Sequence, residues 1–130
     1  MTTQQLSTVS SLSELPERWR SEIQAQLSQG ENVVSALEVD LDQQLRFAKG
    51  MIVVTATRLL ARAPGQQSWQ AWPFSHDLRL RHHDHAGVGH LELIDRTGRL
   101  AAWRFTLGQN LNAIRLTEQF AAHERTLTRG

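Results

Sequence analysis

Residues 82–85 read His-His-Asp-His and form the densest group of side chains that could carry chemistry. Imidazole and carboxylate groups are good ligands for zinc and nickel. On a strand, side chains alternate between two faces, so His83 and His85 would share one face and at most two ligands would converge. A third ligand would have to come from His76 or His90. The pattern favours a polar strand end over a metal site, and a pH-sensing role stays open because histidine titrates near neutral pH.

The other reactive residue types give weaker indications. The chain has no cysteine, which excludes a thiol nucleophile, a disulfide scaffold and a cysteine zinc site. Residues 75–77 read Ser-His-Asp, but neighbours in sequence do not form a catalytic triad by adjacency alone. Glu38, Asp40 and Asp42 would line one strand face, where an acidic, solvated surface is more common than a site for a hard cation. We therefore expect no catalytic, cofactor-binding or metal-binding residue.

The sequence supports a partner-binding surface better than it supports a catalytic activity. Trp69 and Trp72 fall on opposite faces of one predicted strand, so one of them should be the more exposed. Arg79 and Arg81 point outward from the next strand. Exposed tryptophan beside arginine is typical of the anchor residues of protein interfaces. Trp69, Trp72, Arg79 and Arg81 are the candidate partner surface.

Composition limits the class of protein. The chain has 130 residues, which suits one domain, and 14 basic against 13 acidic residues leave a net charge of +1. That balance lacks the strongly basic character of nucleic-acid-binding domains. Residues 51–54 are the longest apolar run, far short of the roughly 18–20 residues of a membrane span. The first residues lack a secretory signal, so we expect a cytoplasmic chain that crosses no membrane.

Hydrophobic periodicity predicts the elements that position these residues. Residues 1–14 read as a flexible leader. A helix should follow, with Leu15, Trp19, Ile23 and Leu27 in one apolar stripe and an end at Gly30. Alternating segments then predict seven strands, near residues 37–42, 45–55, 58–63, 68–74, 78–85, 90–94 and 99–106.

A second helix should begin at Asn110 and carry Leu111, Leu116, Phe120 and Leu127 on its apolar side, before a linker at residues 128–130. Strands never alternate with helices, which argues against a parallel βαβ sheet. The order predicts a mainly β domain over residues 15–127, a seven-stranded antiparallel curled sandwich or open barrel. The C-terminal helix would cap this barrel, with Leu116 and Phe120 plugging its end and Trp103 in the core.

Several segments resemble known families. Residues 30–34 read Gly-Glu before an apolar strand, and residues 50–60 read Gly, four apolar residues, then Thr-x-x-Arg-Leu-Leu. These resemble bacterial PH-like and GRAM-like domains. Residues 37–42, 81–87 and 103–110 extend the likeness to the cytoplasmic N-terminal extension of proteobacterial ABC exporters, in which a fused permease and ATP-binding cassette follow.

The resemblance implies a non-catalytic interaction or regulatory module at the cytoplasmic face of the bacterial inner membrane. Its partners would be a protein or other domains of the same transporter, and a homodimer stays open. ATP-driven export would belong to downstream domains, because Lys49-Gly50 lacks the phosphate-loop pattern. The acidic first hairpin disfavours inositol phosphates. The alternatives are a stand-alone PH-like protein- or ligand-binding domain and, less favoured, a small metal-dependent enzyme that uses His82, His83 and His85.

Overall fold

The computed structural model describes the backbone of residues 15–129 and the side chains of residues 15–122. The expected leader, Gly130 and the side chain of Leu127 lie outside these limits. The elements in chain order are α1 (Glu17–Gln26), β1 (Val33–Leu41), β2 (Phe47–Thr55), β3 (Arg58–Arg62), β4 (Gln70–Pro73), β5 (Arg79–His85), β6 (Val88–Asp95), β7 (Gly98–Thr106), the 3-10 turn η2 (Leu107–Gln109) and α2 (Asn110–Arg129).

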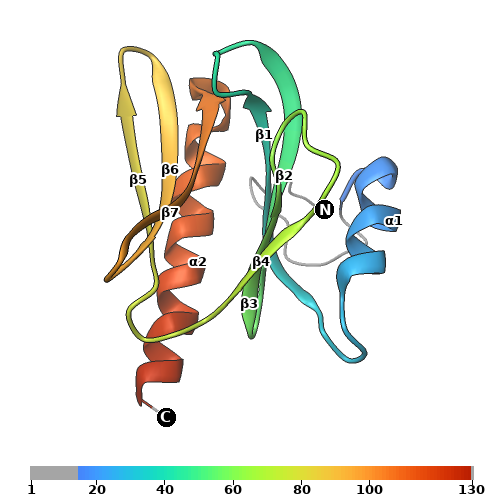
Figure 1. Ribbon diagram of the computed structural model, residues 1–130, viewed down its shortest axis with the longest axis vertical. Coiled ribbons are helices and arrows are strands. Elements are labelled where there is room, and N and C mark those ends of the chain that lie inside the picture. Colours follow the sequence, from blue (N-terminus) through green and yellow to red (C-terminus); the bar gives the residue numbers. More distant parts are fainter. Residues whose placement is uncertain (1–14, 130) are drawn as a thin grey trace, which may run out of the picture.

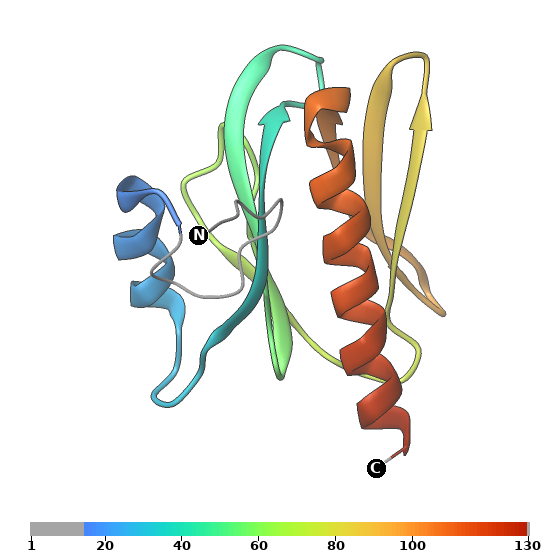
Figure 2. The ribbon, with the colours of Figure 1, turned by 180° about the vertical axis from the view of Figure 1, so that it is seen from behind.

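The described strands form one seven-stranded antiparallel sheet in the order β4-β3-β2-β1-β7-β6-β5. The predicted fold class is therefore confirmed: mainly β, with one helix before the sheet and one after it (Figure 1). β1 and β7 pair only at Leu41 and Arg104, so the sheet bends into two halves at this joint. Helix α2 lies between the halves and contacts both β1 and β5 (Figure 2).

Helix α2 supplies the centre of the main core. Ala113, Leu116 and Phe120 are buried, and the ring of Phe74 packs edge-on against Phe120 with centroids 5.1 Å apart. Leu116 and Phe120 were expected in the core, and both are buried there, against the curled sheet. Leu111 does not belong to this stripe and is 55% exposed. It lies two residues before Ala113, and two residues correspond to a rotation of about 200° around an α-helix.

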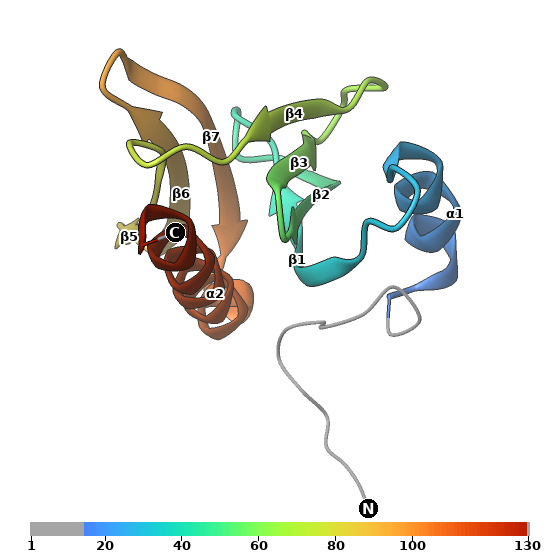
Figure 3. The same ribbon diagram turned by 90° about the horizontal axis from the view of Figure 1, so that it is seen from below.

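Helix α1 builds a second core on the other face of the first half of the sheet (Figure 3). Leu15, Trp19 and Ile23 pack there with Leu27 beside them, as the apolar stripe predicted. Strand β2 is therefore covered on both faces, which explains the unbroken burial of residues 51–55. Burial of this many apolar side chains is the main favourable term in folding.

Both helices end at a different residue from the predicted one, and several strands differ from their predicted bounds by a few residues. Helix α1 ends at Gln26 rather than at Gly30, since Leu27 is already extended and Gly30 adopts a positive φ of 80° in the loop that follows. Helix α2 continues through Thr128 and Arg129, which were expected in a linker. The edge position of Pro73 in β4 agrees with the prediction, because proline cannot donate to a neighbouring strand.

Candidate functional site

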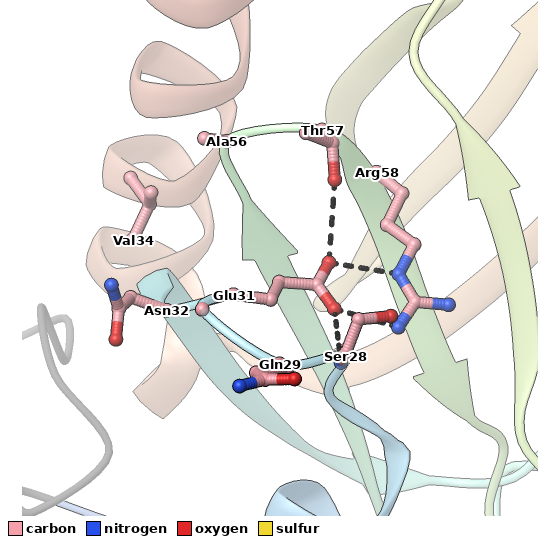
Figure 4. Close-up of a pocket in the computed structure, with 9 residues that line it drawn as sticks. Ser28, Gln29, Glu31, Asn32, Val34, Ala56, Thr57 and Arg58 are labelled. Atoms are coloured by element: carbon pink, nitrogen blue, oxygen red, sulfur yellow. Dashed lines mark hydrogen bonds and ion pairs between the residues drawn. The ribbon is translucent and has the colours of Figure 1, made fainter.

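A pocket of about 510 Å³ opens where the α1–β1 loop meets the β2–β3 turn (Figure 4). Its lining combines polar and apolar groups of both loops: Ser28, Gln29, Gly30, Glu31, Asn32, Val34, Ala56, Thr57 and Arg58. The positive φ of Gly30 lets the first loop turn back toward β1. The two loops are distant in sequence, and the sheet brings them together.

The carboxylate of Glu31 is the centre of the pocket wall. Arg58 donates to it through Nε at 2.8 Å and through its terminal nitrogen at 2.7 Å. The hydroxyl of Thr55 donates at 2.8 Å and that of Thr57 at 3.3 Å, while the backbone N–H of Ser28 donates at 2.9 Å. Only 8% of the Glu31 side chain is exposed. Two loops are thus joined by one charge-assisted network.

These contacts fix the protonation state of Glu31. The hydrogen bonds from Arg58, and more weakly those from Ser28 and Thr55, lower its pKa from 4.5 to about 2 against the opposing effect of burial. The same pairing raises the pKa of Arg58. A carboxylate that stays ionised and already accepts several hydrogen bonds is poorly suited to act as a general acid or base near neutral pH. The geometry makes Glu31 a structural anchor beside a cavity.

The network connects the two segments on which the family resemblance rests. Glu31 belongs to the Gly-Glu segment, and Thr55 and Arg58 are the threonine and arginine of the Thr-x-x-Arg segment. Thr55 ends β2 and accepts hydrogen bonds from the backbone N–H groups of Thr57 and Arg58, which tightens the turn. The sequence indicated both segments but not their contact, because Glu31 and Arg58 lie 27 positions apart.

The histidines of residues 82–85 divide between two faces of β5, as the alternation predicted. His82 lies at 2.7 Å from the Asn110 side-chain oxygen and stacks on Phe105, on the core side. His83 stacks on His90 across β5 and β6, with centroids 4.8 Å apart and planes 2° from parallel. Within residues 15–122, no group of three or more histidine or acidic side chains is arranged to hold a metal ion.

The other candidate acids have separate structural partners. Glu38 accepts a hydrogen bond from the indole of Trp19 at 2.7 Å, and Asp40 accepts one from the hydroxyl of Thr106 at 2.6 Å. Asp42 closes its own hairpin loop by accepting backbone N–H groups. These three carboxylates therefore point to different partners and do not converge.

The Ser-His-Asp segment at residues 75–77 is organised differently from a catalytic triad. The hydroxyl of Ser75 donates to Asp77 at 2.7 Å, and Arg96 donates to the same carboxylate at 3.0 Å. Both bonds lower the pKa of Asp77. The carboxylate thus binds the serine and an arginine.

The candidate partner surface is not brought together as one patch. Trp69 is half-buried, packs edge-on against Trp19 with centroids 6.4 Å apart, and donates to Glu22. Trp72 is half-buried in the main core against Trp103 at 6.1 Å. Arg79 and Arg81 are exposed on β5, the opposite edge of the sheet from β4. The arginines remain at the surface, whereas the tryptophans serve the two cores.

Among the described residues, no helix covers the outward face of β5, β6 and β7 (Figure 3). Arg81 and Glu92 are neighbours across β5 and β6, and the row of His83, His90 and Arg104 crosses all three strands. We call the outward positions of these strands the open face. It is the second candidate site, and it retains the arginine part of the predicted partner surface.

No family model, curated protein or solved structure matches the chain. Among the described residues, no helix is both long enough and apolar enough to cross a membrane.

Proposed function

We propose that the chain is a non-catalytic, PH-like interaction and regulatory module. In this proposal it forms the cytoplasmic N-terminal part of an ABC exporter, whose membrane and ATP-binding domains lie downstream. It would act through contacts with those domains or with another protein at the inner face of the bacterial inner membrane.

The open face is the observation that carries this proposal. Helix α1 covers the outward side of β1, β2 and β3, whereas β5 to β7 keep exposed arginine and histidine side chains on theirs. The groups most suited to chemistry are instead held by structural partners: Glu31 by Arg58, and Asp77 by Ser75 and Arg96. The exposed, charged sheet face, together with acidic side chains that already accept hydrogen bonds from structural partners, favours a binding domain over an enzyme.

The test begins with the coding sequence that follows the codon for Gly130. The proposal expects apolar runs of membrane-span length and a phosphate-binding loop in the same reading frame. The full-length protein, reconstituted in proteoliposomes, should change its ATPase rate when residues 1–130 are deleted. Residues 1–130 alone should give no saturable heat with Mg·ATP in calorimetry. Absence of the downstream domains would refute the exporter context, and a saturable ATP isotherm would refute the non-catalytic assignment.

The pocket favours a second candidate, a stand-alone ligand-binding domain on the same scaffold. Its volume of about 510 Å³ lies within the usual range for small-molecule sites. Screening a small-molecule library by NMR would separate the two. Shifts confined to the amides of Gly30, Asn32 and Thr57 would favour the ligand-binding domain.

A further inference from the structure

The open face concentrates positive charge in a chain that is nearly neutral. Its outward positions carry arginine or histidine on every strand: Arg81, His83 and His85 on β5, His90 on β6, and Arg99 and Arg104 on β7. Glu92 is the carboxylate on the outward side of these described strands. Asp84 takes the other side of β5, since it pairs with Gly89, whose missing Cβ would point at the ring of Phe105 in the core.

Glu92 cannot neutralise this face. It is shared by Arg99 at 3.0 Å and Arg81 at 3.4 Å, which lower its pKa. One carboxylate between two guanidinium groups leaves positive charge. Arg104 donates to the backbone oxygen of Gln43 at 3.4 Å, which satisfies a hydrogen bond but supplies no counter-charge.

From this arrangement we propose that the open face binds an extended acidic segment of a partner protein, with the row of His83, His90 and Arg104 at its centre. The proposal rests on the interaction function proposed above and names the partner's chemistry. Arginine favours this role because its planar guanidinium pairs with carboxylates in two-point contacts.

The geometry favours a peptide over a membrane surface. Outward side chains repeat every second residue along β5, roughly 7 Å apart, which is the spacing of alternate side chains in an extended peptide. A segment with an acid at every second position would therefore match Arg81, His83 and His85 in register. Of the exposed large apolar residues in the described part, only Leu100 lies on these strands, so the face offers little to insert into lipid.

Binding should take up protons. Burial lowers the pKa of His90, and so do the charges of His83, Arg104 and His85, while Glu92 opposes them. His90 is therefore largely neutral at pH 7 in the free protein. A bound carboxylate would supply the counter-charge that the row lacks and favour the imidazolium form of His90. The glutamates of the partner remain mostly ionised at pH 5.5, because their usual pKa is about 4.3.

The test measures binding of a fluorescein-labelled peptide of five Glu-Thr repeats by fluorescence anisotropy. We expect affinity to rise roughly two- to fivefold from pH 8 to pH 5.5, as one exposed ion pair would give. The peptide of five Gln-Thr repeats should not bind. A peptide of the same composition with its five glutamates in one block should bind more weakly, since it loses the alternating register.

Variants of the row test whether binding depends on these particular side chains or only on the positive charge of the domain. His90→Gln should flatten the pH dependence, and Arg104→Gln should weaken binding at both pH values. The matched controls are His76→Gln and Arg115→Gln, which remove the same groups at exposed positions of the β4–β5 loop and of α2. Thermal unfolding checks that each variant is folded. If a variant is unfolded, the unaltered chain provides the test instead, because its binding should weaken as the salt concentration rises.

Three results would overturn the inference: equal binding of the glutamine peptide, equal effects of the control variants, or phosphatidylserine vesicles that bind with the same affinity and the same dependence on this row. The last result would assign the face to a membrane. If the acidic peptide fails to bind while deletion of residues 1–130 still alters the ATPase rate of the full-length protein, only this inference fails and the proposed function stands.

Discussion

Replacement of Glu31 by glutamine tests whether the pocket network holds the two loops together. A pKa that moves from 4.5 to about 2 corresponds to about 3 kcal/mol at roughly 1.4 kcal/mol per pKa unit. The Arg58 side chain is 23% exposed at the pocket mouth, and screening by water there reduces the expected contribution to about 1–2 kcal/mol. Glu31→Gln should therefore lower the free energy of unfolding at pH 7 by about 1–3 kcal/mol, since it also leaves Arg58 without its partner.

The pH dependence gives the sharper measurement. The pKa of Glu31 is lower in the folded chain than in the unfolded chain, so its stabilisation is complete above about pH 5. It is lost as pH falls through 4.5 toward about 2, with more than half gone by pH 3. Urea unfolding at pH 7, 5, 4 and 3 should show the gap between the wild-type chain and Glu31→Gln narrowing as pH falls.

A double-mutant cycle identifies the partner. Glu31→Gln and Arg58→Met should together cost less than the sum of the single changes, with a coupling energy of about 1–2 kcal/mol. Glu118→Gln, on the exposed side of α2, is the matched control and should leave stability within about 0.5 kcal/mol of wild type. A gap between wild type and Glu31→Gln that stays constant from pH 7 to pH 3 would refute the reasoning.

Two further changes test the packing by urea unfolding. Phe120→Ala should lower the free energy of unfolding by about 3–5 kcal/mol, because it removes a buried ring from the core. Phe47→Ala is the control, since the Phe47 side chain is 84% exposed and its loss should change the free energy by less than about 0.5 kcal/mol. Equal urea midpoints for the two variants would contradict the role of Phe120 in the core. Gly89→Ala should cost about 1–3 kcal/mol because its Cβ would overlap the Phe105 ring; a wild-type midpoint would mean that the ring moves aside freely.

The strands and the second helix could be predicted because their signals are local. Alternation in β5 and β6 places Leu80, Leu91 and Leu93 inward, and the structure buries all three. The stripe of Leu116 and Phe120 predicted α2 for the same reason. Each element needs only its own periodicity to be recognised.

The partner surface could not be predicted at the same level, because exposure depends on what covers a strand. Alternation correctly sends Trp69 and Trp72 to opposite faces of their segment, and that pattern suggests one exposed ring. Helix α1 supplies Trp19 on one side, and β7 supplies Trp103 on the other, so both rings are half-buried. Which face receives a second layer is a property of the tertiary structure.

The pocket could not be predicted from the sequence for a related reason. Glu31 and Arg58 are 27 positions apart, and no spacing rule pairs them. The resemblance to PH-like domains marked both segments, and the structure gives their residues a shared task in joining the two loops.

The distribution of charge follows from the same division of the sheet. In the first half, acidic side chains meet donors from other elements: Glu31 meets Arg58, Glu38 meets Trp19, and Asp40 meets Thr106 across the joint. On the open face, Arg81 and Arg99 share the carboxylate of Glu92. The net charge of +1 for the whole chain therefore does not describe the open face, where two guanidinium groups share one carboxylate. On this proposal the open face is where an acidic partner would gain most, because Arg81 and Arg99 share one carboxylate and Arg104 donates to a backbone oxygen.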